Sequence, residues 1–282
     1  MKAKDKLKLL LSNTKAQVRK LKQQSEIQHP KVPVNQLFDL THKCAPVFVL
    51  STGRTGTQLL TNIFALSNSV IAHHEPEPTL NFFSKLAWEE AKENTFFEGI
   101  FEGARYEMLR DAVVLNKTYV ETNNRITFFA RHILRSYPQA KFIHLVREPE
   151  AFVKSGLGRD WYANTNIHDE GRIVKNDAWQ EMNQIAKISW LWAETNRWIF
   201  EFGKSLSKDQ FHVVKSEDLY NDAAKVYNML LFCGIADVSK NAIEKMIERP
   251  VNESKIKSKS LSKEELATVT LMCNKTMKLI YD

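Results

Sequence analysis

Residues 46–60 constrain the fold of this chain more than any other stretch. An apolar run breaks at the glycine-flanked Arg54 and resumes with leucines at helical spacing, which predicts a strand, a tight loop and a helix. The first N–H groups of such a helix lack backbone partners, and the helix dipole is positive there. The loop is therefore a natural phosphate or sulfate site. An ordinary strand-to-helix turn with an exposed arginine would give the same local pattern, so evidence from the rest of the chain is needed to distinguish it from an anion site.

The residues of this loop suit anion binding. Gly53 and Gly56 allow the backbone to curl around an anion, and Arg54 offers a charged, forked donor. The hydroxyl groups of Thr55 and Thr57 add two further donors. We therefore predict that these side chains and the loop backbone contact the anion.

A Walker A loop is the nearest general template for this stretch. Aligning the two places Gly56 on the second glycine, Thr57 on the lysine and Gln58 on the magnesium-binding hydroxyl. Without that lysine and that hydroxyl, the loop is poorly equipped for metal-assisted cleavage of a phosphate bond. Arg54 would have to carry the charge instead, so we predict anion chemistry that needs no metal.

The remaining pattern predicts an α/β fold with a mostly parallel sheet, because strands alternate with helices. Further strands are expected at 70–73, at 113–115 with 118–121, at 142–147 and at 211–215, and helices at 57–67, 82–110, 126–135, from 149, at 182–202, at 223–232 and from 262. Residues 156–179 show no period and are expected to form a long functional loop. Residues 216–219 are expected to open a turn, and a capping box of Ser262 and Glu265 begins the last helix.

The chain is expected to divide into residues 1–43, a basic amphipathic helix with a linker, and residues 44–282, a single α/β domain. The first segment spaces leucines among lysines, so it could contact an anionic membrane or a partner, or simply pack on its own domain. A net charge of +7 favours anionic partners without distinguishing nucleotides, nucleic acid, acidic glycans and membranes. Three distant cysteines and the absence of a signal-peptide pattern or a bilayer-spanning apolar run predict a cytoplasmic protein.

Two more junctions carry chemistry. The strand at 70–73 runs into His74 and Glu75, and the strand at 142–147 ends at Arg147, eight residues before Ser155. Ligands of open α/β sheets bind beyond the carboxyl ends of the strands. We therefore expect these groups to lie near the anion loop.

Taken together, these features resemble the sulfotransferases that use 3′-phosphoadenosine 5′-phosphosulfate. Gly-Arg-Thr-Gly-Thr at 53–57 looks like the family's 5′-phosphosulfate loop, and Phe-Ile-His-Leu-Val-Arg at 142–147 with Ser155 resembles its 3′-phosphate site. Residues 211–219 resemble its late Tyr-Glu-Asp-Leu strand, with Ser216 in place of the tyrosine, a change expected to alter packing. The family's Arg-Lys-Gly segment has no recognisable counterpart; the weak stand-ins are Arg249, Asn252, Lys255 and Lys257.

The resemblance implies a P-loop-like fold with helices on both faces of the sheet and a nucleotide of the adenosine 3′,5′-bisphosphate type as partner, together with a hydroxyl acceptor, no nucleic acid and no metal. By that analogy the 5′-phosphosulfate and 3′-phosphate contacts come from Arg54, Thr55, Gly56, Thr57, Arg147 and Ser155. Gln58, which stands where the family commonly has a second hydroxyl residue, is counted with them as a donor-binding residue. The acceptor is open among a glycan, a lipid, a phenol and a peptide.

Sulfuryl transfer also needs a base for the acceptor's proton, and the candidates are His74, Glu75, Glu77, Glu121 and His144. Glu75 is preferred because it lies just past a strand end, where glycan and protein-tyrosine sulfotransferases use a glutamate. The small-molecule enzymes use a histidine after the third strand, where this chain has Glu121-Thr122-Asn123-Asn124. Glu121 is expected to be structural or to orient the acceptor, and His144 to be a core histidine.

Two other functions stay open at this point. A P-loop kinase also binds adenosine phosphates, although Thr57 and Gln58 stand against it. The chain could also be a non-catalytic module that keeps the nucleotide fold and binds a membrane or an acidic partner through its N-terminal helix.

Overall fold

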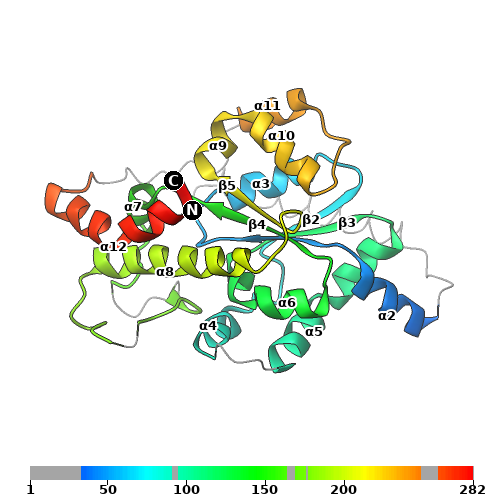
Figure 1. The fold of residues 1–282 in the computed structure, drawn as a ribbon, viewed down its shortest axis with the longest axis horizontal. Coiled ribbons are helices and arrows are strands. Elements are labelled where there is room, and N and C mark those ends of the chain that lie inside the picture. The colour runs from blue at the N-terminus through cyan, green and yellow to red at the C-terminus, as the bar shows by residue number, and fades with distance from the viewer. Residues whose placement is uncertain (1–32, 91–94, 164–168, 176, 249–259, 282) are drawn as a thin grey trace, which may run out of the picture.

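The computed structural model describes residues 33–90, 95–163, 169–175, 177–248 and 260–281. Its centre is one parallel sheet with the strand order β2-β3-β1-β4-β5 (Figure 1). The strands are β1 (Val47–Leu50), β2 (Val70–His74), β3 (Thr118–Thr122), β4 (Lys141–Val146) and β5 (Phe211–Lys215). The predicted α/β fold with a parallel central sheet is thus confirmed.

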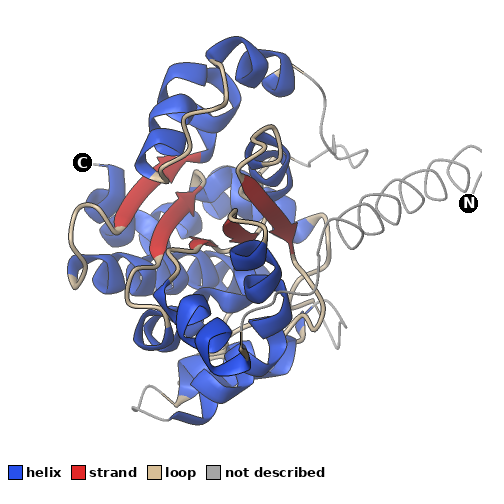
Figure 2. Cartoon of the chain, turned by 90° about the vertical axis from the view of Figure 1, so that its right-hand side faces the viewer, coloured by secondary structure: helices blue, strands red, loops and turns tan. Residues whose placement is uncertain are grey.

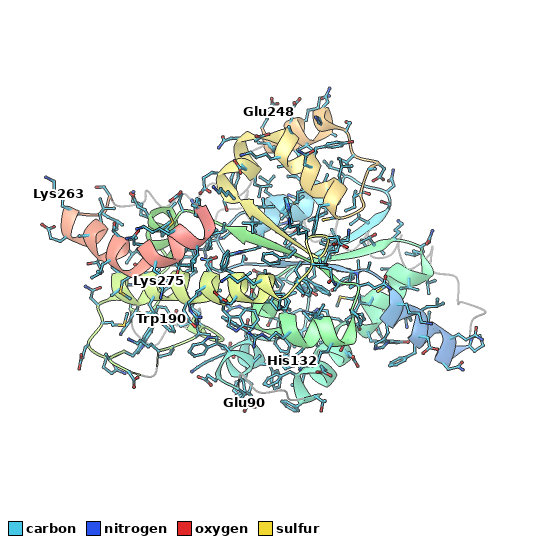
Figure 3. All side chains as sticks on the ribbon, viewed as in Figure 1. Glu90, His132, Trp190, Glu248, Lys263 and Lys275 are labelled. Carbon is cyan, nitrogen blue, oxygen red and sulfur yellow. The ribbon has the colours of Figure 1, made fainter. Side chains whose placement is uncertain are left out.

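Helices cover both faces of this sheet (Figures 1 and 2). On one face lie α3 (Thr57–Phe64), α9 (Ser216–Asn221), α10 (Ala223–Phe232) and α11 (Lys240–Ile247). On the other lie α4 (Asn81–Glu89), α5 (Thr95–Val114), the 3-10 helix η1 (Asn124–Phe129), α6 (Ala130–Ser136) and α8 (Gln184–Lys204), with α7 (Pro149–Leu157) and α12 (Lys263–Tyr281) at one end. Side chains fill the space between these layers (Figure 3).

The alternation of side chains along β1 explains why both faces are covered. Phe48 and Leu50 join the apolar core under α5, α6 and α8, whereas Val47 and Val49 join the core under α3, α10 and α11. All four side chains are fully buried. Successive residues of a strand point to opposite faces, so a strand that is apolar throughout must be buried on both sides.

Two segments differ from the sequence-based expectation. Residues 82–110, which were expected to be helical, contain α4 and most of α5, but the expected strand at 113–115 is wrong because Val113 and Val114 complete α5. Packing of Leu109 and Ala112 into the core outweighs the β-propensity of the valines. Residues 216–219 belong to α9, a helix in place of the expected turn.

The two ends of the described chain pack on the domain. Residues 34–43 form α2 (Val34–Lys43), and its His42 ring stacks on Tyr137 with 5.4 Å between centroids. The predicted capping box at α12 is confirmed: the N–H of Ser262 donates to Glu265 at 2.7 Å, and the N–H of Glu265 donates back to Ser262 Oγ at 3.2 Å. The expected amphipathic helix before residue 33 and the four stand-ins at 249–257 lie outside the described residues. Within the described residues, no helix is both long enough and apolar enough to cross a membrane.

Candidate functional site

The carboxyl ends of the five parallel strands meet at one edge of the sheet, where ligands of α/β proteins bind. Each strand delivers a polar residue to this edge. The residues are the loop 51–56 after β1, Glu75 after β2, Asn123 to Arg125 after β3, Arg147 after β4 and Ser216 after β5. The sequence features that were predicted to converge therefore share one edge of the molecule.

The loop after β1 has a backbone that requires glycine at two positions. Gly53 and Gly56 have φ values of 78° and 93°, in the left-handed region. A Cβ atom on Gly53 would lie 3.2 Å from the side chain of Asn124, and one on Gly56 would lie 3.0 Å from the hydroxyl of Tyr220. Arg54 also has a positive φ, 56°, which is uncommon for a residue with a side chain and often marks a functional position.

Hydrogen bonds hold this loop at both of its ends. The backbone of Ser51 donates to Thr127 Oγ1 at 3.1 Å, and the same hydroxyl donates to the carbonyl of Ser51 at 3.0 Å. At the other end, Ser216 Oγ donates to the carbonyl of Thr55 at 2.5 Å. Ser216, expected to affect packing, thus anchors the loop directly, so the loop is shaped before any ligand binds.

Two arginines and a serine converge on the loop. Arg54 Nε donates to Ser155 Oγ at 3.2 Å, and Arg147 Nη1 donates to the carbonyl of Arg54 at 2.9 Å. Burial lowers the pKa of Arg54, the nearby Arg159 and Arg147 lower it further, and the charge of Glu75 is among those that raise it. Positive groups gathered in this way favour an anionic ligand.

Thr55, Thr57 and Gln58 have different surroundings. Thr55 Oγ1 is buried and has no hydrogen-bond partner among the described residues, so it is available to a ligand. Thr57 is buried at the first position of α3. Gln58 Nε2 donates to Asn62 Oδ1 at 3.4 Å, one turn further along α3.

Three of the five candidate bases have different surroundings. Glu121 is fully buried and bound by Arg105 on both carboxylate oxygens. His74 Nδ1 lies 3.1 Å and 3.0 Å from the carbonyl and the hydroxyl of Thr122. Glu75 is exposed, and its charge raises the pKa values of Arg54 and Arg125, which burial lowers. Of these three groups, Glu75 is therefore the accessible carboxylate whose charge acts on the loop arginine.

His144 behaves as a core histidine, as expected. Its Nε2 lies 2.8 Å from Asn196 Oδ1, and burial lowers the pKa of the ring to about 4. The ring is thus neutral at physiological pH, and its Nε2 contacts Asn196 of α8.

Sequence reasoning missed three residues of this site: Asn124, Arg125 and Tyr220. Asn124 packs on Gly53 and Tyr220 packs on Gly56. Arg125 Nη1 donates to the carbonyl of Glu170 at 2.9 Å, which joins the strand edge to the long loop. The available signal was the run of polar residues directly after β3, since polar residues at a strand's carboxyl end are site candidates.

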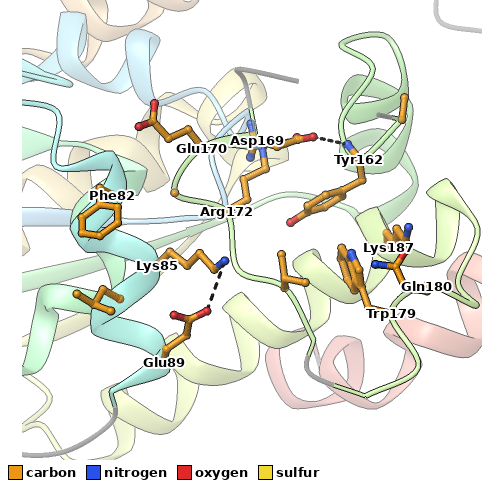
Figure 4. Close-up of a pocket in the computed structure, with 14 residues that line it drawn as sticks. Phe82, Lys85, Glu89, Tyr162, Asp169, Glu170, Arg172, Trp179, Gln180 and Lys187 are labelled. Carbon is orange, nitrogen blue, oxygen red and sulfur yellow. Dashed lines mark hydrogen bonds and ion pairs between the residues drawn. The ribbon is translucent and has the colours of Figure 1, made fainter. Parts of the chain in front are cut away.

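A cleft of about 730 Å³ opens beside this site, between α4 and the loop that precedes α8 (Figure 4). Its walls include Phe82, Lys85, Leu86, Glu89, Tyr162, Asp169, Glu170, Gly171, Arg172, Trp179, Gln180 and Lys187. Gly171 and Arg172 also line a small cavity whose other walls include Ser51, Thr52 and Arg125. The cleft therefore leads toward the start of the anion loop.

The charged groups of the cleft are largely balanced. Lys85 Nζ lies 3.5 Å from Glu89, and Arg172 Nε lies 3.4 Å from Asp169 (Figure 4). Lys187 lies over the Trp179 ring at 5.2 Å. The cleft thus offers aromatic surface and polar groups of both signs.

Among the described residues, no group of three or more His, Cys, Asp or Glu side chains could hold a metal ion.

Comparison with known proteins bears on the family and the fold of this chain. A family profile described as the sulfotransferase family matches residues 46–238. Searching curated proteins finds no match. Among solved structures, a sulfotransferase from Alicyclobacillus acidocaldarius is similar in fold, with a TM-score of 0.52 at 16% identity over 84% of this chain and 94% of that one.

Two further solved structures share the fold. A sulfotransferase from Mycobacterium avium has a TM-score of 0.53 at 11% identity, over 87% of this chain and 79% of its own. A sulfotransferase domain from the curacin biosynthetic pathway has a TM-score of 0.50 at 15% identity, over 81% and 97%. The profile covers the anion loop, all five strands and Arg147, and the chain belongs to the sulfotransferase family.

Proposed function

We propose that this protein transfers a sulfuryl group from 3′-phosphoadenosine 5′-phosphosulfate to a hydroxyl group. In this proposal the loop residues Arg54, Thr55, Gly56 and Thr57 hold the phosphosulfate, and Arg147 and Ser155 hold the 3′-phosphate. Glu75 accepts the proton of the acceptor. Gln58 is also among the proposed donor-binding residues, and its amide donates to Asn62.

One observation carries the proposal: Arg54, Arg147 and Ser155 meet at a preformed loop on the carboxyl edge of the sheet. The buried hydroxyl of Thr55, which lacks a partner within the described chain, supports the fit of an anion. Members of this family that resemble the chain in these motifs take their sulfuryl group from the phosphoadenosine donor. The residues present fit that donor.

The chain's own residues have three tasks in this reaction. When bound, the donor supplies an activated sulfuryl group whose leaving group is a phosphate. Arg54 and the helix N-terminus at Thr57 stabilise negative charge on that phosphate. Arg147 and Ser155 orient the nucleotide. Glu75 removes the proton of the acceptor hydroxyl as the acceptor oxygen bonds to sulfur. The proton ends on the carboxylate of Glu75, and the S–O bond to the phosphate breaks.

The cleft beside α4 is proposed to receive the acceptor. It leads toward Ser51 and Arg125 through Gly171 and Arg172. Its paired charges disfavour a polyanion, and its many polar groups disfavour a bare hydrocarbon. Aromatic rings beside hydrogen-bonding groups suit a neutral acceptor that has both ring faces and hydroxyl groups.

Replacing Trp179 with alanine is expected to raise the KM for the acceptor by about fivefold, because one aromatic contact contributes about 1 kcal/mol. Affinity for adenosine 3′,5′-bisphosphate should stay unchanged. The measurement uses whichever compound of a panel of neutral saccharides and phenols gives the highest rate. Tyr227→Ala, on α10 at the opposite face of the sheet, is the matched control. An unchanged KM in Trp179→Ala would exclude this wall from acceptor binding.

The proposed function is tested by supplying sulfur-radiolabelled donor in the presence of a chelator. We expect formation of adenosine 3′,5′-bisphosphate with transfer of label to a hydroxyl compound or to water. A kinase would instead consume ATP only with magnesium. Magnesium-dependent ATP turnover without use of the labelled donor would contradict the proposal.

A further inference from the structure

A fully buried ion pair lies directly behind the turn that carries Glu75. Arg105 of α5 and Glu121 of β3 have no exposed side-chain surface. Arg105 Nε donates to Glu121 Oε2 at 2.9 Å and Nη2 donates to Oε1 at 3.0 Å, a two-pronged geometry. The donor site described above does not use either residue.

Every N–H of the Arg105 side chain has an acceptor. Besides Glu121, the guanidinium donates to the carbonyls of Pro78 at 3.0 Å, Ala104 at 3.2 Å and Pro76 at 3.2 Å. A guanidinium has five N–H donors, and these five bonds account for all of them. Two of the five therefore hold the turn that follows Glu75.

This turn has few other means of holding its shape. Pro76 and Pro78 have no N–H to donate, so they cannot extend the pairing of β2. Glu75 has a φ of 44°, in the left-handed region, and its N–H donates to the carbonyl of Thr122 at 3.2 Å. A residue with a side chain adopts this conformation when its surroundings impose it.

Glu121 also connects to the residues that follow β3. Its oxygens also accept from the hydroxyl of Tyr119 at 2.7 Å and from Asn123 Nδ2 at 2.9 Å. Asn123 Oδ1 in turn accepts from the backbone N–H of Arg125 at 2.9 Å. One buried network thus connects the turn at Glu75 with the start of η1 at Arg125.

A buried ion pair is a weak source of stability, because the cost of removing two charges from water offsets their attraction. Its value here lies in the fixed geometry of five hydrogen bonds. We propose that Arg105, held by Glu121, is a positioning residue that fixes the carbonyls of Pro76 and Pro78 and so directs the carboxylate of Glu75 toward the anion loop. This inference rests on the proposed role of Glu75 as the base.

The informative variant is Arg105→Lys. Lysine keeps the buried positive charge beside Glu121, but a single ammonium cannot reproduce the fork that reaches both proline carbonyls. We expect kcat to fall by about 10- to 100-fold, since a displacement of about 1 Å at the reacting group has this effect. Affinity for adenosine 3′,5′-bisphosphate should stay within about twofold of the wild type. Release of radiolabelled sulfate from the donor, with water as acceptor, measures kcat without a known acceptor.

A double-mutant cycle separates positioning from a structural role. If Arg105 acts through Glu75, Arg105→Lys should cost little further activity in a Glu75→Gln background, whereas independent effects would multiply. Arg110→Lys is the matched control, because Arg110 lies on the same helix and pairs with Asp111 at the surface. It should leave kcat unchanged.

Different outcomes separate this inference from the proposed function. A wild-type kcat in Arg105→Lys, or effects of the two substitutions that multiply in the double mutant, would overturn the positioning role of Arg105. If Glu75→Gln is impaired in the same experiment, the proposed function is still supported. A normal rate in Glu75→Gln overturns both the base and its positioning. If Arg105→Lys does not fold, Arg105→Met combined with Glu121→Leu removes both charges, which keeps the interior neutral. That variant should show the same loss of kcat with retained nucleotide affinity, and a wild-type kcat would overturn the inference.

Discussion

Glu75→Gln is expected to lower kcat by about 100-fold or more, the usual contribution of a general base. Glutamine keeps the size of the side chain but cannot accept the acceptor's proton. Glu75 is exposed, so the change should leave the fold intact. Affinity for adenosine 3′,5′-bisphosphate should remain close to that of the wild type, which locates the loss in the chemical step. Rates are measured as release of labelled sulfate or of labelled product, and affinity by titration.

Glu77 provides the matched control for this prediction. It lies in the same proline-bounded turn, is exposed, and accepts from the N–H of Thr79 at 3.2 Å. Glu77→Gln should change kcat by no more than about twofold. If Glu77→Gln is as slow as Glu75→Gln, the loss comes from the turn as a whole, and if Glu75→Gln is as fast as the wild type, another group is the base.

Arg54→Ala is expected to weaken binding of adenosine 3′,5′-bisphosphate by about 10- to 100-fold, because a hydrogen bond to a charged group contributes about 1.5–3 kcal/mol. The change removes the guanidinium and its bond to Ser155, while the backbone anchors at Ser51 and Ser216 remain. Isothermal titration gives the dissociation constants. Arg197→Ala, which removes an exposed α8 arginine paired with Glu194, should bind normally.

The same titrations can contradict the proposed role of Arg54 in binding the nucleotide. Nucleotide affinity equal to the wild type would show that Arg54 does not contact the donor. A loss of equal size in Arg197→Ala would show a general effect of net charge. Arg54→Lys should fall between the wild type and Arg54→Ala, because it keeps the charge without the fork.

Local sequence was sufficient for the loop and for most strands. The apolar run of β1 is followed by a loop that contains Gly53 and Gly56, and both glycines adopt the conformation that only glycine adopts readily. The carboxyl ends of parallel strands share an edge, so Arg147 and Glu75 could be placed near the loop from their positions after β4 and β2. The direct bond between Arg54 and Ser155 was not predictable, because it depends on how α7 packs beside the loop.

Other features of the site arise from contacts between distant segments. Tyr220 covers Gly56 because residues 216–221 form α9, where the sequence suggested a turn. The pairing of Arg105 with Glu121 joins a helix to a strand, and no local pattern in either segment indicates it. The cleft at Trp179 is formed by α4 together with a loop that has no regular period. Such contacts are set by tertiary packing, which short-range patterns do not encode.

The most direct test of the central claim is a thermal shift with adenosine 3′,5′-bisphosphate in the presence of a chelator. A ligand that binds only the folded state stabilises it by about 2.7 kcal/mol at 100 times its dissociation constant, which corresponds to a Tm increase of about 5 °C in a protein of this size. Adenosine 5′-monophosphate, which lacks the 3′-phosphate assigned to Arg147 and Ser155, should give a smaller shift. We predict a saturable rise in Tm with the bisphosphate that Arg54→Ala weakens. No shift at high bisphosphate concentration, or a larger shift with ATP and magnesium, would contradict the account.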